Sequence, residues 1–234
     1  YQDRPSERRL CRWSQSHPQY RYKKKELIGD LYRAGTLYGR TPIETLDHDY
    51  PSLAEGKVIP HGIYDLKKNH GYINLGTSHD TSEFAIDSLR RWWQYRGRYD
   101  YPDATSILIL CDSGGSNGCR SILFKVDLQR FAEATGLGIR VAHFPPYTSK
   151  YNPIDHRLFP HVHRACQGVI FTGIERVKEL MAKATTKTGL RVRVHILDKV
   201  YQTGRKVTRE IKDQMRILFD EDLPQWNYRL LPAE

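Results

Sequence analysis

The sequence has 234 residues, of which 39% are hydrophobic, so it can bury an ordinary core in one large domain or in one domain with appendages. It contains 37 Lys and Arg residues against 27 Asp and Glu residues, which gives a formal net charge of +10. Such an excess favours a polyanionic partner such as nucleic acid. A merely basic surface is the alternative that charge alone leaves open.

The composition excludes a membrane-spanning protein and gives no sign of export. The sequence has no apolar run of about eighteen residues, and its start, "YQDRPSERRLCRW", lacks the hydrophobic region of a secretory signal. We therefore expect a soluble, cytoplasmic protein with no membrane partner. Because the sequence starts at Tyr1 rather than Met, we also expect a fragment or a processed product.

The cysteines show no pattern that suggests a metal site or a disulfide framework. They form no C-x-x-C pair and have no spacing typical of zinc ligands. We therefore expect free thiols at all four positions, which are Cys11, Cys111, Cys119 and Cys166.

The N-terminal stretch differs in character from the rest of the chain. Residues 1–21 contain several arginines and little apolar periodicity, so they are interpreted as an arm or linker. Residues 22–234 are interpreted as one folded domain. Its first elements are predicted to be three antiparallel strands within 23–33, 58–66 and 71–77, because the last two are apolar runs joined by the short polar link "KKNH".

An amphipathic helix is predicted over 81–97, with Thr81 or Ser82 as its N-cap and Gly97 as its stop. Its apolar residues form one broad helical face, which consists of Phe84, Ile86, Leu89, Trp92 and Trp93. We expect the tryptophans to pack against a sheet. A platform for stacking nucleic-acid bases is the alternative.

A continuous apolar run of strand length, 106–112, ends at an acid, as is typical of a central strand covered on both faces. A helix over 119–136 and a strand over 137–144 are predicted to follow. The later segments are predicted to be a helix, a strand and a helix, at 173–189, 190–197 and 208–219. From about residue 169 they are interpreted as a cap on the same domain. The order of elements predicts an α/β domain with a mixed sheet flanked by helices.

Asp112 stands between this strand and the glycine-rich segment "SGGSNG". In open α/β sheets ligands bind beyond the carboxyl ends of strands, so the carboxylate is predicted to project into a cleft. A turn or cap residue is the alternative. The segment lacks the Lys-Ser/Thr ending of a phosphate-binding P-loop, so we set nucleotide binding aside.

A second acid, Asp155, follows a proline-rich loop after the next predicted strand. Three prolines within "HFPPYTSKYNPIDHRLF" restrict the backbone and lead to Asn152 and Asp155 at the start of a helix. An acid that only complements the helix dipole is the alternative.

Asp112 and Asp155 follow strands that are expected to be neighbours, so we expect their carboxylates to meet at one cleft. Oxygen ligands with retained waters suit Mg²⁺ or Mn²⁺. Two such ions about 3.5 to 4 Å apart activate a water or a 3′-hydroxyl in phosphodiester transfer.

The loop "HFPPYTSKYNPIDHRLF" resembles the "PPYSPxxNPIE" segment of mariner-like and related insertion-sequence transposases, which carries the last acid of their DDE or DDD triad. Other segments are similar to the Rhodopirellula-type DDE transposases: "KKKELIGD", "GIYDL", "HDTSEFAIDSLRRWW", "DSGGSNG", "TTKTGL" and "WNY". The resemblance covers most of the chain. It implies an RNase H-like core in which three antiparallel strands precede parallel strands, and metal-dependent cleavage and strand transfer at transposon ends.

Under this resemblance Asp112 matches the second acid and Asp155 the third, where this branch usually has Glu. An Asp keeps the charge but shortens the arm by one methylene, which alters the metal geometry. Ser113, Asn152 and His156 match positions beside these acids and are expected to support the site. The implied cofactor is Mg²⁺ or Mn²⁺, with two ions bound. The implied partner is double-stranded DNA of the transposon ends and target, in a prokaryotic nucleoid, and a homodimer is one possible assembly.

The first acid of the triad has no match in the sequence. The family has an apolar strand that ends in Asp-Thr before "KKKEL", and Arg21 stands where that Asp is expected. The preceding "SERRLCRWSQSHPQ" looks like unrelated sequence joined at about residue 22, as a frameshift or truncation would produce, so we expect a truncated first strand. Asp30, nine residues downstream of Arg21, is a poor substitute, and Asp80 is interpreted as a helix-capping residue.

Two hypotheses of different class follow from the acids and from Arg21. The first is a transposase catalytic domain that cleaves and joins DNA. The second is a catalytically inactive remnant that keeps the fold and nonspecific DNA binding, because a cation cannot ligate Mg²⁺. An unrelated nuclease with the same RNase H-like sheet is a third reading.

Overall fold

The computed structural model describes residues 15–16, 18–22, 25–36, 38, 40, 44–46 and 51–233, with the backbone alone described at 15–16, 18–22, 51 and 149. Residues 1–14, the main part of the predicted arm, lie outside the described residues, as does Cys11. The other three cysteines are buried, and none of them forms a disulfide with a described residue, as predicted. None of the described helices has both the length and the apolar character needed to cross a membrane.

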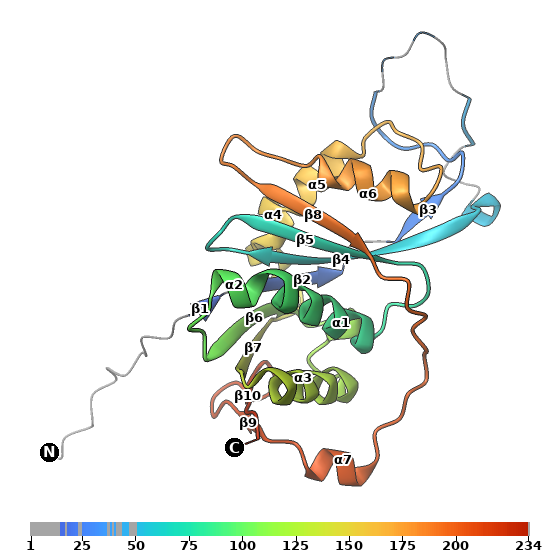
Figure 1. Cartoon of the computed structure of the whole chain (residues 1–234). Helices are drawn as coiled ribbons and strands as arrows, with labels where there is room; N and C mark the ends of the chain where they lie inside the picture. The colour runs from blue at the N-terminus through green and yellow to red at the C-terminus, as the bar shows by residue number, and fades with distance from the viewer. Residues whose placement is uncertain are drawn as a thin grey trace, which may run out of the picture.

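Ten described strands form a mixed sheet with the order β8-β5-β4-β2-β6-β7-β10-β9, with β1 beside β6 and β3 beside β4 (Figure 1). The strands are β1 Gln15–Ser16, β2 Pro18–Tyr22, β3 Glu26–Ile28, β4 Gly56–Asp65, β5 His70–Gly76, β6 Ser106–Asp112, β7 Gly138–Phe144, β8 Arg191–Ile196, β9 Ile217–Phe219 and β10 Asn227–Leu230. β2, β4 and β5 are antiparallel neighbours, whereas β6 is parallel to both β2 and β7. The predicted mixed sheet is confirmed.

Helices cover both faces of the sheet (Figure 1). They are α1 Ser82–Trp92, α2 Arg98–Asp100, α3 Ile122–Thr135, α4 Ile154–Arg157, α5 Phe159–Ala165, α6 Ile174–Ala182 and α7 Arg209–Asp213. One core lies between the sheet and α1 and α3, and the other lies between the sheet and α4, α5 and α6. Because side chains alternate along a strand, Ile63 of β4 enters the first core and Tyr64 enters the second.

The helix predicted over 81–97 is confirmed at its start and corrected at its end. The Thr81 hydroxyl accepts a hydrogen bond from the Phe84 N–H at 3.2 Å, as an N-cap does. Gly97 does not stop the helix, since a π-helical turn over Trp93–Gly97 leads directly into α2. A Cβ at Gly97 would lie 2.5 Å from the Trp93 ring, so the glycine permits close packing there. Trp92 is buried in the core, as predicted.

The central β-α-β unit follows the prediction closely. β6 spans the predicted 106–112, and β7 begins one residue after the predicted start. Between them, α3 begins at its N-cap Ser121 and ends at Gly136, whose φ of 71° is left-handed and therefore suits glycine. This unit places Asp112 at the end of a central strand.

Three segments differ from the sequence interpretation. Residues 18–22, expected in the arm, form β2 in the middle of the sheet, between β4 and β6. The helix predicted over 208–219 is helical only in α7, because residues 217–219 pair with β10 as strand β9. β10 itself was not predicted and pairs with β7. The C-terminal part therefore lengthens the sheet at both edges, with β8 beside β5.

Candidate active site

Asp112 is the last residue of β6 and is half-buried. β6 is parallel to β7, and Asp112 lies in register with Phe144, the last residue of β7. The loop that leaves β7 therefore starts beside Asp112. This geometry follows directly from the parallel pairing of the two strands.

The proline-rich loop returns to Asp112 through Asn152. The Asn152 side chain is 0% exposed, and its Nδ2 donates a hydrogen bond to Asp112 Oδ1 at 3.1 Å. The Asn152 carbonyl accepts a hydrogen bond from the Asp155 N–H at 3.0 Å. Asp155 is half-buried in the first turn of α4. The structure thus brings Asp112, Asn152 and Asp155 to one end of the sheet.

Ser113 and His156 hold the loop on either side of these residues. The Ser113 hydroxyl donates to the Phe144 carbonyl, which joins the ends of β6 and β7. His156 is exposed, and its Nε2 lies 2.6 Å from the Lys150 carbonyl oxygen. Both contacts hold the backbone of the proline-rich loop in place.

A buried histidine that the sequence analysis did not single out supports Asp112 from behind. His143 Nδ1 lies 3.1 Å from the Asp112 carbonyl oxygen, and His143 Nε2 lies 3.1 Å from the Tyr228 hydroxyl. Burial lowers the pKa of His143 to about 4, so the ring is neutral at pH 7. A neutral ring donates from Nδ1 to the carbonyl and accepts at Nε2 from Tyr228. The alternation of β7, with 139, 141 and 143 buried, was the available sequence signal.

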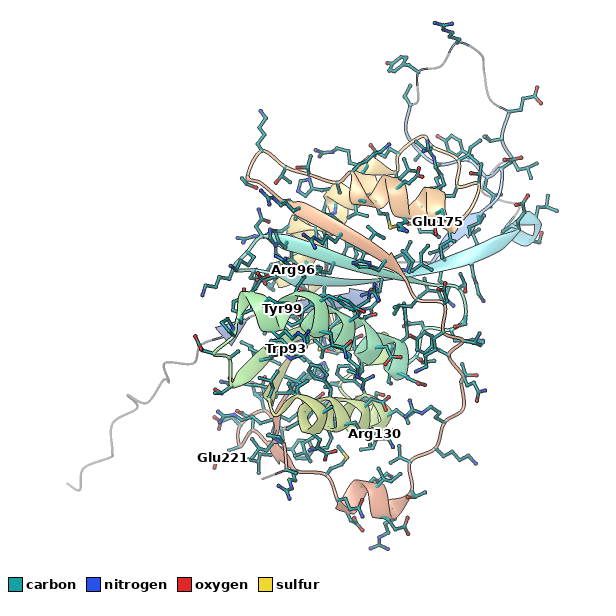
Figure 2. The ribbon with its side chains drawn as sticks, viewed as in Figure 1. Trp93, Arg96, Tyr99, Arg130, Glu175 and Glu221 are labelled. Atoms are coloured by element: carbon teal, nitrogen blue, oxygen red, sulfur yellow. The ribbon has the colours of Figure 1, made fainter. Side chains whose placement is uncertain are left out.

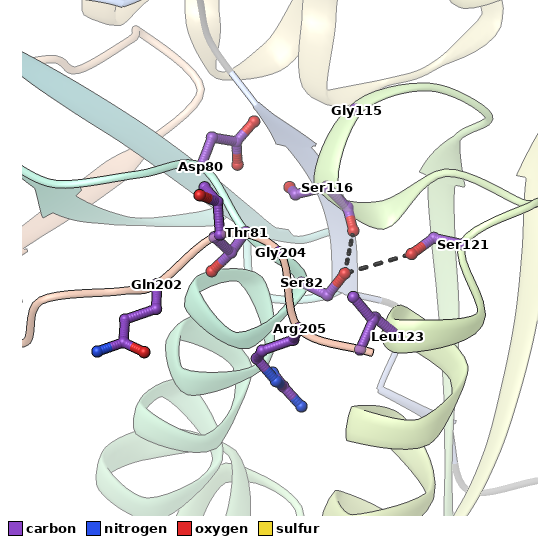
Figure 3. A pocket seen from close by; sticks show the side chains of 11 residues that line it. Asp80, Thr81, Ser82, Gly115, Ser116, Ser121, Leu123, Gln202, Gly204 and Arg205 are labelled. Atoms are coloured by element: carbon purple, nitrogen blue, oxygen red, sulfur yellow. Dashed lines mark hydrogen bonds between the residues drawn. The ribbon is translucent and has the colours of Figure 1, made fainter. Parts of the chain in front are cut away.

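Asp80 is not the cap that the sequence analysis expected, since Thr81 has that role. Instead Asp80 lines a cavity of about 360 Å³ beside Gly115 and Ser116, in the segment that follows Asp112 (Figure 3). Burial raises the pKa of Asp80, while a hydrogen bond from Ser116 and the charge of Lys25 oppose this. Ser82 closes the cavity wall with a 2.9 Å hydrogen bond to the Ser116 carbonyl.

Arg21 lies in β2 close to Asp112 in the sheet register. Tyr20 pairs with Cys111 across the parallel strands β2 and β6, so Arg21 and Asp112 are the next residues along each strand. On its other side Arg21 pairs with Gly62 of β4. The backbone thus brings position 21, where the resemblance leads us to expect the first acid, beside Asp112. Asp30, by contrast, is exposed in a bend after β3.

The residues at this end of the sheet fit a divalent cation, but incompletely. Asp112 and Asp155 supply the carboxylate oxygens that Mg²⁺ and Mn²⁺ prefer. Asn152 Oδ1 is buried without a hydrogen-bond partner among the described residues, so the site contains a further oxygen. Within the described ranges no group of three or more His, Cys, Asp or Glu side chains is arranged to hold a metal ion.

Comparison with protein families identifies the family of the chain. The family model described as "Rhodopirellula transposase DDE domain" matches residues 20–232, which is nearly the whole sequence. The chain belongs to this family. The resemblance seen in the sequence is therefore confirmed, and the family is one of transposases, enzymes that act as polynucleotidyl transferases and generally use divalent metal ions. The match begins at residue 20, inside β2.

Solved structures with similar folds come from Mos1 transposase. A Mos1 paired-end complex with left transposon end has 15% sequence identity and a TM-score of 0.48, over 70% of this chain and 46% of that chain. A Mos1 mariner paired end complex with Mn has 16% identity and a TM-score of 0.46, over 70% and 46% of the two chains. The chain thus spans less than half the length of these proteins. No curated protein matches the chain.

Proposed function

We propose that this chain is the catalytic domain of an insertion-sequence transposase, which cleaves DNA phosphodiester bonds at the ends of the element and joins them to target DNA. The observation that supports this most is the position of Asn152. It donates to Asp112 Oδ1 at 3.1 Å and accepts from the Asp155 N–H at 3.0 Å. Two acids that are distant in the sequence are thereby held at one end of a sheet.

In this proposal Asp112 and Asp155 hold Mg²⁺ or Mn²⁺, with two ions bound as the family resemblance implies. Bound ions would activate a water or a 3′-hydroxyl and would stabilise the leaving oxygen. The protein's own part is to keep the carboxylates in place. Asn152 restricts the rotation of the Asp112 carboxylate, and neutral His143 fixes its backbone carbonyl. Such positioning residues reduce the reorganisation needed when metal and DNA bind.

DNA is the partner that the charge of the chain favours. The net charge of +10 attracts the phosphate backbone, and neutralised phosphates release counterions. Duplex DNA of the transposon ends and of the target is the proposed substrate.

A second candidate function is an inactive remnant that keeps the fold and binds DNA without cleaving it. The register of β2 favours it, because Arg21 stands beside Asp112 where a third carboxylate is needed. An Arg at this position cannot ligate a divalent cation, so it supplies none of the oxygen ligands that Mg²⁺ and Mn²⁺ prefer.

Nicking of a labelled duplex in Mn²⁺ tests the proposed chemistry. We expect slow, metal-dependent nicking by the purified chain and its loss in Asp112→Asn, which removes a ligand charge at nearly constant shape. Absence of nicking with both acids intact would favour the remnant. Calorimetric titration with Mg²⁺ separates the two further, since binding that is lost in Asp155→Ala requires a working metal site.

A further inference from the structure

A basic surface lies at the β8 edge of the sheet, four strands away from β6 and Asp112. We name it the basic ridge and define it by eight residues from three elements: Lys67 and Lys68 of the β4–β5 turn, Arg91, Tyr95, Arg98 and Tyr99 of the segment from α1 to α2, and Arg191 and Arg193 of β8. Figure 2 labels Tyr99 and the neighbouring Arg96 on this segment. No part of the proposed active site lies within it.

The α1–α2 segment contributes alternating cationic and aromatic side chains. Arg91, Tyr95 and Tyr99 follow one another at intervals of four residues, so they lie along one side of the helical path. The guanidinium of Arg91 lies 4.7 Å from the centre of the Tyr95 ring, and that of Arg98 lies 4.7 Å from the Tyr99 ring. Tyr95 and Tyr99 are 62% and 63% exposed, although tyrosines usually bury their rings.

Strand β8 brings two further arginines to the same side of the sheet. Val192 and Val194 point into the core against α6, so the alternating Arg191 and Arg193 point to the opposite face and are exposed. Arg193 pairs with Tyr72 in register. Arg91 Nη2 lies 3.3 Å from Nδ1 of His195, also on β8, which joins the strand to α1.

The β4–β5 turn completes the ridge. The Arg191 N–H donates to the Asn69 carbonyl at 3.4 Å, so the turn lies against the start of β8. The ammonium groups of Lys67 and Lys68 lie 5.6 and 5.9 Å from the centre of the Tyr101 ring, which follows α2. The three elements therefore form one continuous surface.

The positive charge of the ridge is largely uncompensated. Among the described residues, none of its six cations forms an ion pair, whereas neighbouring Arg90 and Arg96 pair with Asp87 and Asp100. The pKa of His195 is lowered first by burial and then by the charges of Arg91, Arg193 and Lys178. The lowered pKa agrees with a positive potential at the β8 edge of the sheet.

The ridge and the acids are separated across the sheet rather than along it. β8 and β6 are the first and fifth strands in the order β8-β5-β4-β2-β6, and the four spacings between them amount to about 19 Å. The register leads from Arg193 through Tyr72, Ile63 and Tyr20 to Cys111, so Arg193 lies almost level with Asp112 along the strands. DNA on the ridge is therefore in contact with the protein about four strands away from the acids.

We propose that the basic ridge is a second DNA-binding surface, which holds the phosphate backbone of duplex DNA away from the site of cleavage. Unpaired arginines bind phosphate oxygens through paired N–H donors, and the exposed tyrosines pack against sugar and backbone. The proposal extends the proposed function only in its partner, DNA, and needs neither metal nor cleavage.

A protective role is the competing explanation for part of the ridge. β8 is an edge strand in the described sheet, and charged side chains on edge strands prevent pairing with other chains. That role does not explain the exposed tyrosines or the lysines of the turn. It makes a different prediction, since neutral residues on β8 would then promote self-association without changing DNA affinity.

Fluorescence anisotropy with a labelled 30-base-pair duplex of mixed sequence, in EDTA and at several salt concentrations, tests the proposal. We expect Arg191→Gln/Arg193→Gln to bind about tenfold more weakly at low salt. The slope of log affinity against log salt should fall by about 2, since each lost phosphate contact removes about 0.9. The control is Arg209→Gln/Lys212→Gln, which removes two charges from exposed α7 and should change neither quantity. Thermal unfolding checks that each variant is folded.

Equal binding by the ridge and control variants overturns the proposal, and self-association of the ridge variant in sedimentation would then support edge protection. A larger loss on a single strand of the same sequence than on the duplex also overturns the assignment to duplex DNA. If Arg191→Gln/Arg193→Gln does not fold, Lys68→Gln/Arg98→Gln tests the same surface from its other two elements. Because all binding is measured in EDTA, these outcomes are independent of nicking by the acids.

Discussion

Strands β6 and β2 lie side by side and reach the same end of the sheet, but with opposite charges. β6 ends in Asp112, which is held by Asn152 and backed by His143. β2 carries Arg21, the residue after the pair of Tyr20 with Cys111. Both strands nevertheless keep their register in one sheet. The comparison teaches that the pairing of β2 with its neighbours in the sheet does not require an acid at position 21.

The largest change in nicking activity is expected from placing an acid on β2, as β6 has at its end. Arg21→Asp adds a carboxylate beside Asp112 and removes a cation, so we expect Mn²⁺-dependent nicking to rise by about 100-fold or more. Arg21→Asn is the matched control, since it removes the charge without adding a ligand and should raise nicking far less. Equal rates for Arg21→Asp and the unchanged chain would show that this position takes no part in the site.

A large loss of metal affinity is expected when an acid of the proposed site is removed. Asp155→Ala removes one of the two proposed carboxylate ligands, and we expect the affinity for Mn²⁺ in calorimetry to fall by more than about 100-fold, beyond the 10 to 100-fold typical of residues that only support a ligand. Asp30→Ala is the control, because Asp30 is exposed after β3. An equal loss of Mn²⁺ affinity in Asp30→Ala would show that the effect is not specific to Asp155, and would contradict the proposed site.

Asn152→Ala tests how much the hydrogen bond from Asn152 to Asp112, at the end of β6, stabilises the fold. The substitution removes a buried hydrogen bond to a charged carboxylate, so the free energy of unfolding should fall by about 2 to 3 kcal/mol. Urea unfolding at pH 7 measures this. A loss below about 0.5 kcal/mol would mean that Asn152 does not hold Asp112.

The buried His61 lies on β4 beside β2, and its protonation is expected to lower the stability of this part of the core. Burial lowers the pKa of His61 to about 4, whereas the unfolded chain titrates at its usual value of 6.5. The stability that the neutral, buried His61 ring contributes is therefore complete above pH 6.5 and is lost as the pH falls towards 4. The free energy of unfolding should fall by about 2 kcal/mol between pH 7.5 and 5. Urea unfolding should show this pH dependence reduced in His61→Gln. An unchanged pH dependence in the variant would contradict the assignment.

Local patterns predicted the elements whose residues carry their own signal. β6 was predicted residue for residue, because a continuous apolar run ends at an acid, and the β4–β5 hairpin followed from two apolar runs and a polar link. The expected proximity of Asp112 and Asp155 rested on the order of strands. It agrees with the contacts of Asn152, although metal binding by these acids stays a prediction.

Elements that depend on distant partners were not predictable in this way. β2 has few apolar residues and is defined by its neighbours β4 and β6. β9 was assigned to a helix because its pairing with β10 is not visible in local periodicity. His143 and Tyr228 are 85 residues apart, so their contact behind Asp112 appears only in the folded chain.

Anomalous X-ray diffraction from crystals soaked in Mn²⁺ tests the central claim most directly. The account predicts an anomalous peak within coordination distance of carboxylate oxygens of both Asp112 and Asp155, and its absence in crystals of Asp112→Asn. Mn²⁺ bound elsewhere, or two carboxylates too far apart for one ion to contact both, would contradict it.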